Sequence, residues 1–186
     1  MLGPSGSGKS TVARELHRRG VIDVTPSWTT RPRRADERDG SVEHRFVEGD
    51  QFTARHNAGY FLEVVQMFGL PYRYGLPRVK PPADGLVPAI IVRAPLMPLV
   101  HRHFPGHVAY QIEDRYQRAE ERLRRRAGDL GTRLDGFEDE CRLGRETAHR
   151  IFVNEGSIAD LVEAVAGAVY HDFDGQWKED ACPEAR

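Results

Sequence analysis

The sequence predicts one α/β domain built around a parallel β-sheet, and two observations lead to this fold class. Short apolar segments, such as residues 88–92 and 108–112, alternate with helical segments along the chain, as expected for a parallel sheet covered by helices. A glycine-rich segment also stands directly before the first helix, where such loops bind phosphate. The 186 residues are enough for one domain with a sizeable core.

The first elements follow from local signals in the order of the chain. A helix is expected at residues 10–19, because its apolar residues share one face and Gly20 supplies a C-terminal cap. A strand is expected at residues 21–24. Residues 26–45 are polar and rich in arginine, which predicts a loop with short edge strands.

The middle of the chain predicts a helix, a strand and a turn before the next buried strand. Asp50 is expected to cap a helix that ends at Gly59, and residues 60–67 are expected to be extended. Proline and glycine at residues 81–85 predict a turn. The apolar run at residues 88–92 then predicts a buried parallel strand.

The C-terminal part alternates strands and helices. Strands are expected at residues 108–112 and 151–153, and charged helices at residues 115–127 and 135–150. A last helix is expected at residues 157–170. Ser157 and Asp160 form its capping box, and its apolar stripe consists of Ile158, Leu161, Val162, Val165 and Val169. Residues 171–186 lack periodicity and are expected to be a disordered tail.

Composition excludes several classes of protein. The formal net charge is −1 and arginine gathers at residues 31–38 and 115–126, which suits small phosphorylated ligands better than nucleic acid. The two cysteines, Cys141 and Cys182, are far apart and form neither a disulfide framework nor a zinc motif. We find no membrane-spanning run and no signal peptide, and therefore expect a cytoplasmic protein.

Residues 3–10, Gly-Pro-Ser-Gly-Ser-Gly-Lys-Ser, match the phosphate-binding pattern G-x-x-x-x-G-K-[ST] at every fixed position. The glycines let backbone N–H groups point at phosphate oxygens, and the following helix adds its positive N-terminus. Lys9 is expected at the β- and γ-phosphates of ATP, and the Ser10 hydroxyl at Mg²⁺. The motif predicts the three-layer sandwich of P-loop NTPases. Its ATP-binding residues are expected to be Gly3, Pro4, Ser5, Gly6, Ser7, Gly8, Lys9, Ser10 and Thr11.

A buried strand should lead into such a loop, but only Met1 and Leu2 precede it. We therefore expect a truncated first strand, either because the start is placed too late or because the strand is reduced to a stub.

Further motifs resemble the guanylate kinase family. Residues 25–34, Thr-Pro-Ser-Trp-Thr-Thr-Arg-Pro-Arg-Arg, are similar to the nucleotide-monophosphate-binding region of that family. The other similar motifs are Asp39-Gly40, Phe46-Val47, Phe61-Leu62-Glu63, Tyr74-Gly75, Arg122-Leu123-x-x-Arg126, Arg142-Leu143 and Val153-Asn154. The resemblance covers residues 3 to about 169. It implies one domain over residues 1–170, with an acceptor-binding insert at about 27–86 and an arginine-bearing lid at about 124–137.

This resemblance implies transfer of the γ-phosphate of ATP to a phosphorylated acceptor, with GMP or dGMP first. It assigns catalysis to Lys9, Arg126 and Arg142, and places Asn154 beside the adenine of ATP. Arg124, Arg125 and Arg133 are alternatives to Arg126. It implies acceptor binding by Ser27, Arg31, Arg34, His44, Glu63, Tyr74 and Arg93. From the residues alone, Arg31 and Arg34 form a phosphate clamp or a solvated basic loop.

Three positions depart from the guanylate kinase pattern. His44 replaces a phosphate-binding tyrosine, Leu76 replaces a hydroxyl residue, and Arg93 follows residues 89–92 where that family has aspartates for magnesium and the acceptor base. The ribose 1,5-bisphosphate phosphokinase family also resembles the chain at Gly40-Ser41-x-x-His44 and also lacks these aspartates. Arg93 then either binds a second acceptor phosphate or projects into solvent.

A third alternative is a non-catalytic interaction module that resembles guanylate kinases. Such modules lose the glycines and lysine of the phosphate loop, whereas Gly8, Lys9 and Ser10 are present here. The sequence therefore favours an enzyme that needs Mg²⁺ and ATP. It gives no indication of the oligomeric state.

Overall fold

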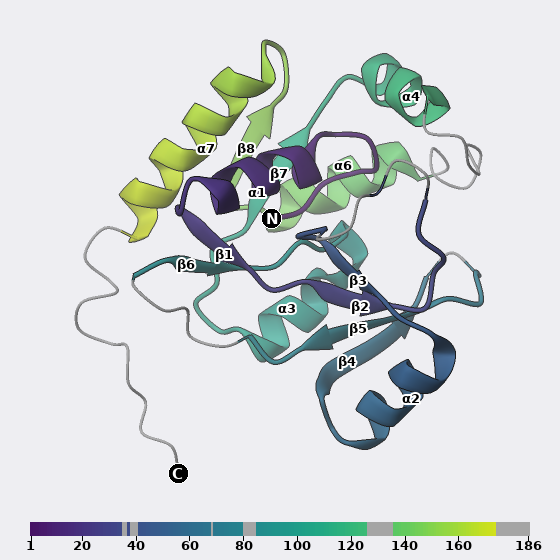
Figure 1. The fold of residues 1–186 in the computed structure, drawn as a ribbon. Helices are drawn as coiled ribbons and strands as arrows, with labels where there is room; N and C mark the ends of the chain where they lie inside the picture. Colours follow the sequence, from purple (N-terminus) through teal and green to yellow (C-terminus); the bar gives the residue numbers. More distant parts are fainter. Residues whose placement is uncertain (35–36, 38–40, 68, 80–84, 126–135, 174–186) are drawn as a thin grey trace.

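The computed structural model describes residues 1–34, 37, 41–67, 69–79, 85–125 and 136–173. In chain order the elements are α1 (Lys9–Arg18), β1 (Ile22–Val24), β2 (Ser27–Thr29), β3 (His44–Phe46), α2 (Gly49–Asn57), β4 (Phe61–Gln66), β5 (Arg73–Pro77), β6 (Val87–Ala89), the 3₁₀ helix η1 (Ala94–Leu96), α3 (Met97–His103), β7 (Tyr110–Glu113), α4 (Tyr116–Arg125), α6 (Phe137–Thr147), β8 (Arg150–Val153) and α7 (Ile158–Phe173) (Figure 1).

The core sheet is parallel, and the first two residues of the chain occupy its centre. β1 pairs with β6 and β7 pairs with β8, both in parallel. Met1 joins the two pairs on one side, donating from its amino group to the Ile90 carbonyl at 2.8 Å. On the other side, Leu2 bonds to Tyr110 at 2.8 Å and Ile112 bonds back to Leu2 at 2.9 Å. Met1 and Leu2 therefore lie between the two strand pairs and lead directly into the phosphate loop.

Helices cover both faces of this sheet and complete the three-layer α/β fold (Figure 1). On one face α1 packs against α7, and their apolar residues form a cluster that includes Leu16, Ile112 and Val165, each fully buried. On the other face η1, α3 and α6 bury a smaller cluster around Leu2 and Met97. The predicted fold class is confirmed.

A second sheet, in the order β3-β2-β5-β4, projects from the core together with α2 (Figure 1). β2 is parallel to β3 and antiparallel to β5, so it is an inner strand rather than the edge strand expected from sequence. α2 is held by Phe52, which is fully buried and stacks on Phe61 with ring centroids 4.7 Å apart. This sheet and helix form the described part of the predicted insert.

The last helix begins as predicted and ends later. The Ser157 hydroxyl accepts from the Asp160 backbone N–H at 3.1 Å, and the Asp160 carboxylate accepts from Ser157, so the capping box is confirmed. Ile158, expected in the apolar stripe, is 41% exposed, because it stands at the first turn beyond the core. The helix continues to Phe173, so residues 171–173, expected in the tail, are helical.

Three local predictions need correction. Asp50 lies in the first turn of α2, and Glu48 takes the N-cap position. β5 and α3 were not predicted, because β5 contains Gly75 and Pro77 and α3 begins with Met97-Pro98 after a proline-containing turn. In the described part of the chain, no helix has the length and apolar character needed to span a membrane.

Candidate functional site

The phosphate loop curls between the centre of the sheet and α1. Gly3, Gly6 and Gly8 have positive φ angles of 137°, 81° and 103°, which side chains strongly disfavour. At Gly3 a Cβ atom would also stand 2.1 Å from the carbonyl oxygen of Ile112. Glycine at position 3 is therefore required both by backbone conformation and by the close approach of β7.

Lys9 opens α1 and reaches back across the loop. Its side chain is almost buried, and its ammonium group donates to the Pro4 carbonyl at 2.7 Å. Ser7 is fully buried, and its hydroxyl has no hydrogen-bond partner in the described part of the structure. The loop thus combines the Lys9 ammonium group, the unpaired Ser7 hydroxyl and glycines with positive φ angles. Such a loop is suited to binding phosphate.

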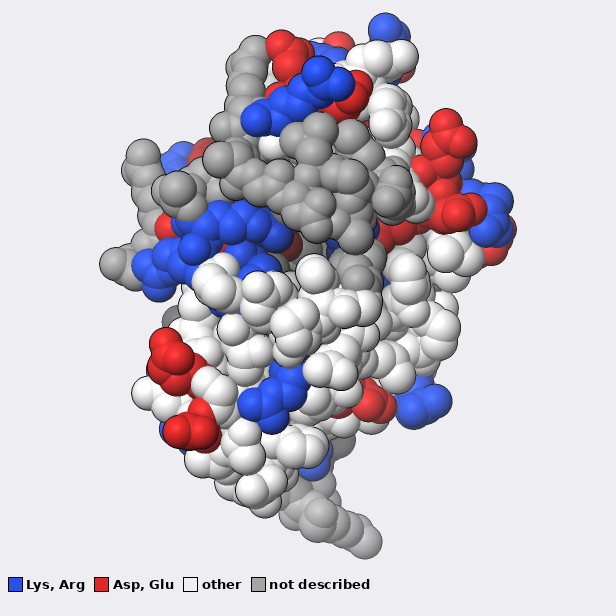
Figure 2. All heavy atoms as spheres, turned by 90° about the vertical axis from the view of Figure 1, so that its right-hand side faces the viewer, with Lys and Arg blue, Asp and Glu red and all other residues white. Residues whose placement is uncertain are grey.

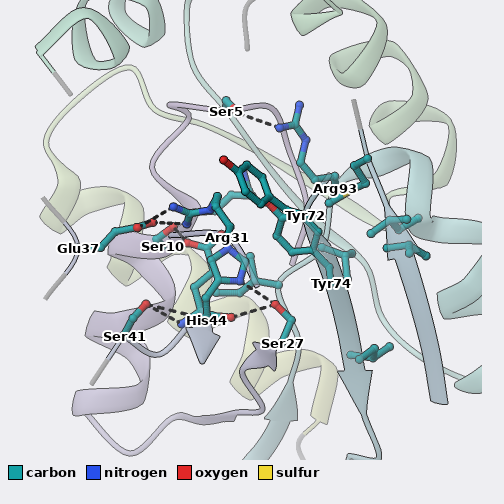
Figure 3. A pocket seen from close by; sticks show the side chains of 18 of the residues that line it. Ser5, Ser10, Ser27, Arg31, Glu37, Ser41, His44, Tyr72, Tyr74 and Arg93 are labelled. Atoms are coloured by element: carbon teal, nitrogen blue, oxygen red, sulfur yellow. Dashed lines mark hydrogen bonds and ion pairs between the residues drawn. The ribbon is translucent and has the colours of Figure 1, made fainter. Parts of the chain in front are cut away.

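A single large cavity, with a volume of about 1130 Å³, joins this loop to the second sheet. In Figure 3, Arg31, Tyr72, Tyr74 and Arg93 converge on the space next to Ser5 and Ser10. All the predicted acceptor-binding residues line this cavity: Ser27, Arg31, Arg34, His44, Glu63, Tyr74 and Arg93. The fold thus brings together residues separated by more than 80 positions in sequence.

Arg31 is the most deeply placed cation of the insert, with 7% of its surface exposed. Its guanidinium binds Glu37 through two hydrogen bonds of 2.9 and 2.6 Å, and Arg34 lies 3.5 Å from the same carboxylate. Burial raises the pKa of Glu37, but the bonds from Arg31 and from the Arg34 backbone outweigh burial and lower it. Arg31 and Arg34 therefore both contact the Glu37 carboxylate, and their role as a phosphate clamp stays a prediction.

His44 is held on the opposite wall by Ser27, whose hydroxyl lies 2.7 Å from the ring Nδ1. Burial and the positive charges of Arg31 and Arg34 lower the pKa of His44, and the neighbouring Glu43 opposes them. The ring of Tyr74 lies 5.9 Å from that of His44. A neutral imidazole at this position is a hydrogen-bonding group and adds no charge at neutral pH.

Glu63 reaches the cavity from β4, and α3 holds its carboxylate. His103 Nε2 lies 2.9 Å from Glu63 Oε1, and Arg102 lies 3.4 Å from the same oxygen. Both contacts are made to the same carboxylate oxygen. A carboxylate held in this way has a fixed direction.

Arg93 points toward the phosphate loop and not into solvent. Its guanidinium donates to the Ser5 hydroxyl at 2.9 Å and pairs with Glu140, of which 4% is exposed. Burial raises the pKa of Glu140, with Arg93 acting against it. Of the two alternatives for Arg93, projection into solvent is wrong.

On the far side of the loop, α4 and the end of β8 surround Gly8. Arg122 donates to the Gly6 carbonyl at 2.8 Å and pairs with the buried Asp114. Asn154 is 6% exposed, and its amide nitrogen lies 3.5 Å from the position of a Cβ on Gly8. Asn154 thus lies beside the phosphate loop, and its place beside adenine stays a prediction.

The predicted lid arginines are only partly described. Arg126 lies outside the described residues. Arg142 is on α6, where it pairs with Glu146 at 2.9 Å and Asp139 at 3.4 Å, and it is outside the cavity lining. Its catalytic role stays a prediction that requires it to leave these partners.

The structure adds site residues that the sequence analysis did not select. These are Glu37, Glu43, Tyr72, His103, Asp114, Glu140 and, for its contact with the phosphate loop, Arg122. Glu43 and Glu140 have partners that are distant in sequence, so only the fold reveals them. Arg122 belongs to a recognised motif and Tyr72 stands near one, and this was the available signal.

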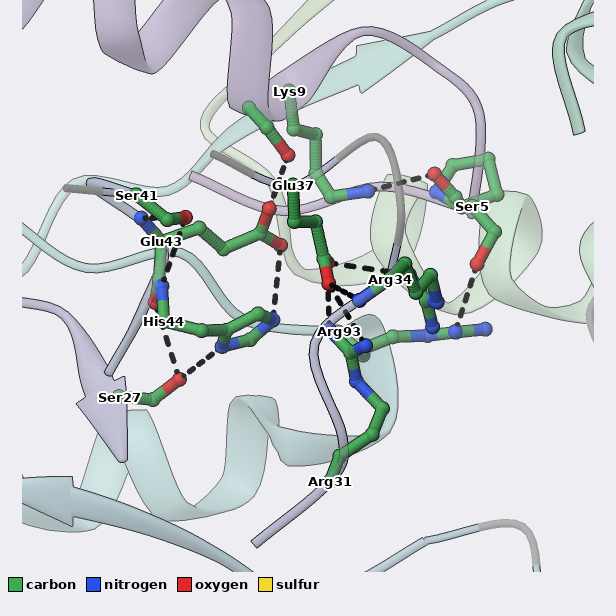
Figure 4. Close-up of polar contacts among 12 residues, drawn as sticks. Ser5, Lys9, Ser27, Arg31, Arg34, Glu37, Ser41, Glu43, His44 and Arg93 are labelled. Atoms are coloured by element: carbon green, nitrogen blue, oxygen red, sulfur yellow. Dashed lines mark hydrogen bonds and ion pairs between the residues drawn. The ribbon is translucent and has the colours of Figure 1, made fainter. Parts of the chain in front are cut away.

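Ser10 and Glu43 supply the oxygen atoms on which the fit of Mg²⁺ can be tested. The Ser10 hydroxyl donates to the Glu43 carboxylate, and both residues line the cavity next to Lys9 (Figures 3 and 4). A hydroxyl and a carboxylate are hard oxygen donors of the kind that Mg²⁺ uses when phosphates and waters fill its other positions. The residues fit the ion.

Comparisons with known proteins show which proteins the chain resembles. No protein-family model matches the chain. The chain is similar to guanylate kinases of Frankia casuarinae, with 43% identity over 79 residues, and Thermobifida fusca, with 46% identity over 79 residues. These matches cover 42% of this chain and 41% and 39% of the relatives, so the chain spans about two-fifths of the relatives it matches.

The similarity in fold extends further than the similarity in sequence. A crystal structure of guanylate kinase from Anaplasma phagocytophilum superposes with a TM-score of 0.63, covering 97% of this chain and 86% of that one at 23% identity. The resemblance to guanylate kinases is therefore confirmed in sequence for part of the chain and in fold for nearly all of it.

Proposed function

We propose that the chain is an ATP-dependent phosphotransferase that converts GMP or dGMP into GDP or dGDP. The observation that carries this proposal is the shared cavity, which places the phosphate-loop residues Lys9 and Ser10 in one space with Arg31, Arg34 and Tyr74. Phosphoryl transfer requires donor and acceptor phosphates side by side in a site rich in positive charge. The guanylate kinase relatives support GMP as the acceptor.

The residues of this chain would divide the reaction between them. The acceptor phosphate is already an anionic nucleophile, so no general base is required. Lys9 neutralises the moving γ-phosphate, and Arg31 and Arg34 hold the acceptor phosphate in line. Arg126 and Arg142 are proposed to arrive with a closing lid. Mg²⁺ bound near Ser10 would neutralise charge on the β- and γ-phosphates.

Guanine would be read by Ser27 and Glu63. A carboxylate accepts hydrogen bonds from the N1–H and the 2-amino group of guanine together, which adenine does not offer. Glu63 is suited to this task because His103 and Arg102 bind one oxygen and leave the other for the base. The apolar Leu76 lines the same cavity without adding a polar group.

A coupled ADP-release assay across GMP, dGMP, AMP, UMP, CMP and ribose 1,5-bisphosphate tests the proposal. GMP and dGMP should be turned over best. Exclusive use of ribose 1,5-bisphosphate would replace GMP by the sugar phosphate, and ATP binding without any turnover would favour a non-catalytic module. The relatives found here favour neither of these alternatives.

The variant Glu63→Gln tests whether Glu63 recognises the guanine base. The substitution presents a donor to the donors of guanine, a mismatch that costs about 1–3 kcal/mol, so kcat/KM for GMP should fall about ten- to a hundredfold. The preference for GMP over AMP should also weaken. Arg93→Ala is the companion variant, expected to be mild for GMP and severe for a sugar bisphosphate. GMP kinetics unchanged by Glu63→Gln would contradict the role in guanine recognition.

The remaining proposals concern the surroundings of the enzyme. We propose that it acts in the cytoplasm and binds neither nucleic acid nor membranes. In Figure 2, the largest group of basic side chains lies at the left of the view, and the other basic side chains are scattered among uncharged and acidic ones. A local group of this kind suits a small phosphorylated ligand better than a nucleic-acid backbone, which needs an extended basic surface.

A further inference from the structure

The carboxylates nearest to the phosphate loop differ in whether their oxygens are already engaged by arginine. Asp114 is paired with Arg122, Glu140 with Arg93, and Glu37 with Arg31. The core strand β6 leads not to an acidic residue but to Arg93. The carboxylate that contacts the phosphate-loop serine is instead Glu43, which belongs to the acceptor insert.

The contact between Ser10 and Glu43 orients the serine oxygen. The Ser10 hydroxyl donates its hydrogen to Glu43 Oε2. Because the hydrogen is directed at the carboxylate, the lone pairs of the serine oxygen are left for a cation. The other carboxylate oxygen, Oε1, lies 3.6 Å from His44 Nε2, and Glu43 lines the same cavity as Lys9 and Ser10.

The backbone fixes Glu43 in this position. Its carbonyl accepts from the backbone N–H of Ser27 at 3.1 Å and from the Ser27 hydroxyl at 3.3 Å (Figure 4). The Glu43 N–H lies 3.4 Å from the Ser41 hydroxyl. β2 and the turn before β3 therefore hold the carboxylate against the start of α1, and 24% of the side chain is exposed to the cavity.

We propose that Glu43 completes the magnesium site of this chain from the acceptor insert, a step that rests on the proposed ATP-dependent function. Glu43 orients Ser10 toward the ion and binds one of the waters in its coordination shell. Two protein groups are enough, because Mg²⁺ retains several waters and takes its remaining ligands from the phosphates. The site accordingly takes small, hard divalent cations, namely Mg²⁺ and Mn²⁺.

Mn²⁺ binding measured by electron paramagnetic resonance tests this site without any acceptor. Glu43→Gln should weaken Mn²⁺ binding to the complex of protein and ATP about 10- to 100-fold, the usual cost of losing a group that orients a metal ligand. The affinity for ATP in excess EDTA should stay unchanged or improve, because a negative charge is removed. Glu48→Gln is the matched control on an exposed residue outside the cavity and should behave like the wild type.

A double-mutant cycle separates this role from simple support of the fold. Ser10→Ala and Glu43→Gln should each weaken Mn²⁺ binding, and the double variant should be little worse than either. Glu43→Asp keeps the charge and should retain part of the affinity. Wild-type Mn²⁺ affinity in folded Glu43→Gln would overturn the proposal. If Glu43→Gln does not fold, additive effects of Ser10→Ala and Glu43→Asp would overturn it instead.

The metal site and the proposed acceptor can fail independently. Wild-type protein that binds Mn²⁺ and ATP through Glu43 but does not phosphorylate GMP would contradict the acceptor assignment alone. Wild-type protein that phosphorylates GMP while Glu43→Gln retains full Mn²⁺ affinity would contradict the metal site alone.

Discussion

Lys9 lies where the phosphate loop becomes α1, and its side chain contacts the loop and not the apolar core. Lys9→Ala should therefore leave the fold intact while removing the charge that is most valuable when the γ-phosphate moves. We expect the barrier to rise by about 3 kcal/mol or more, which is a loss of at least about a hundredfold in kcat. Steady-state kinetics and a thermal melt measure the two effects. Wild-type turnover would contradict the phosphate-loop assignment.

Arg31 and Arg34 belong to the acceptor side of the cavity. Replacing either by alanine should raise the KM for GMP at least about tenfold and change the KM for ATP little, because each removes charge-assisted bonds to the acceptor phosphate alone. Arg18→Ala, on the exposed face of α1 and paired with Glu15, is a suitable control. Equal increases in both KM values would indicate a general structural role.

At the residue scale, the sequence predicts the residues that would contact phosphate better than it predicts the residues that hold them in place. Gly3, Lys9 and Arg31 are readable because phosphate chemistry demands these residue types in a short pattern. Glu37, Glu43 and Glu140 are single acidic residues in a chain with 28 of them, and their importance arises from contacts across the fold. His103 belongs to a helix that the sequence did not predict, so its contact with Glu63 was not foreseeable.

At the scale of elements, the approach of α6 to β7 leaves no room for a side chain at Gly144. A Cβ there would stand 1.4 Å from Gln111 Oε1, and the Gln111 amide donates to the Cys141 carbonyl at 2.9 Å. Gly144→Ala should displace this fully buried glutamine and lower the free energy of unfolding by about 1–3 kcal/mol.

Gly167 in α7 provides the matched control. It is also a helical glycine, but apart from its chain neighbours and the backbone of its own helix, no heavy atom of the described residues lies within 4 Å of its Cβ position. Gly167→Ala should raise the free energy of unfolding by up to about 1 kcal/mol, because alanine is the better helix former. Denaturant unfolding compares the two variants. Destabilisation of similar size in both would show that helix context and not Gln111 decides the effect.

The elements that the sequence predicts well have a strong period or a cap. α1 and α7 fall within about three residues of their expected limits because Gly20 and the Ser157 capping box mark their ends. β5 and α3 contain glycine or proline in places that normally argue against a strand or a helix. Their neighbours in the fold stabilise them, and a single sequence does not show those neighbours.

At the scale of the whole molecule, one carboxylate connects the last helix to the core sheet. Asp172 in α7 accepts from the Tyr110 hydroxyl of β7 at 2.7 Å and from Arg150 of β8 at 2.6 Å. The bonds from Arg150, with those from Tyr110 and His171, lower the pKa of Asp172 against the smaller effect of burial. Stability from this group is fully present above the unfolded pKa of about 3.9 and is lost as the pH falls through the lower folded value.

Asp172→Asn should therefore destabilise the protein at pH 7 and much less near pH 3. We expect a loss of about 1 kcal/mol for a charged, partly exposed network, or a few degrees in Tm. The difference in Tm from the wild type should stay constant from pH 7 to about pH 5 and shrink below pH 4. Asp50→Asn, on an exposed residue of α2, is the control. A difference that grows with acidity would contradict this account.

The overall architecture was predictable because alternating apolar segments and one phosphate loop leave few arrangements open. The sequence did not show how the two sheets meet. That junction creates the cavity and brings Glu43 of the second sheet's β2–β3 connection to Ser10, 33 positions away, while packing within the core brings Arg93 to Ser5, 88 positions away. Long-range pairs of this kind depend on the complete packing of the chain.

The pairing of Arg31 with Glu37 affects how strongly the site binds small anions from solution. In the absence of substrate, the clamp is filled by a carboxylate of its own chain through two hydrogen bonds. A free inorganic phosphate must displace that internal competitor and gains nothing else, whereas a nucleotide also gains the contacts of its base and sugar. On the proposed function, Glu37 therefore lowers the affinity of Arg31 for free phosphate and other small anions. A nucleotide acceptor offsets this competition through the contacts of its base and sugar.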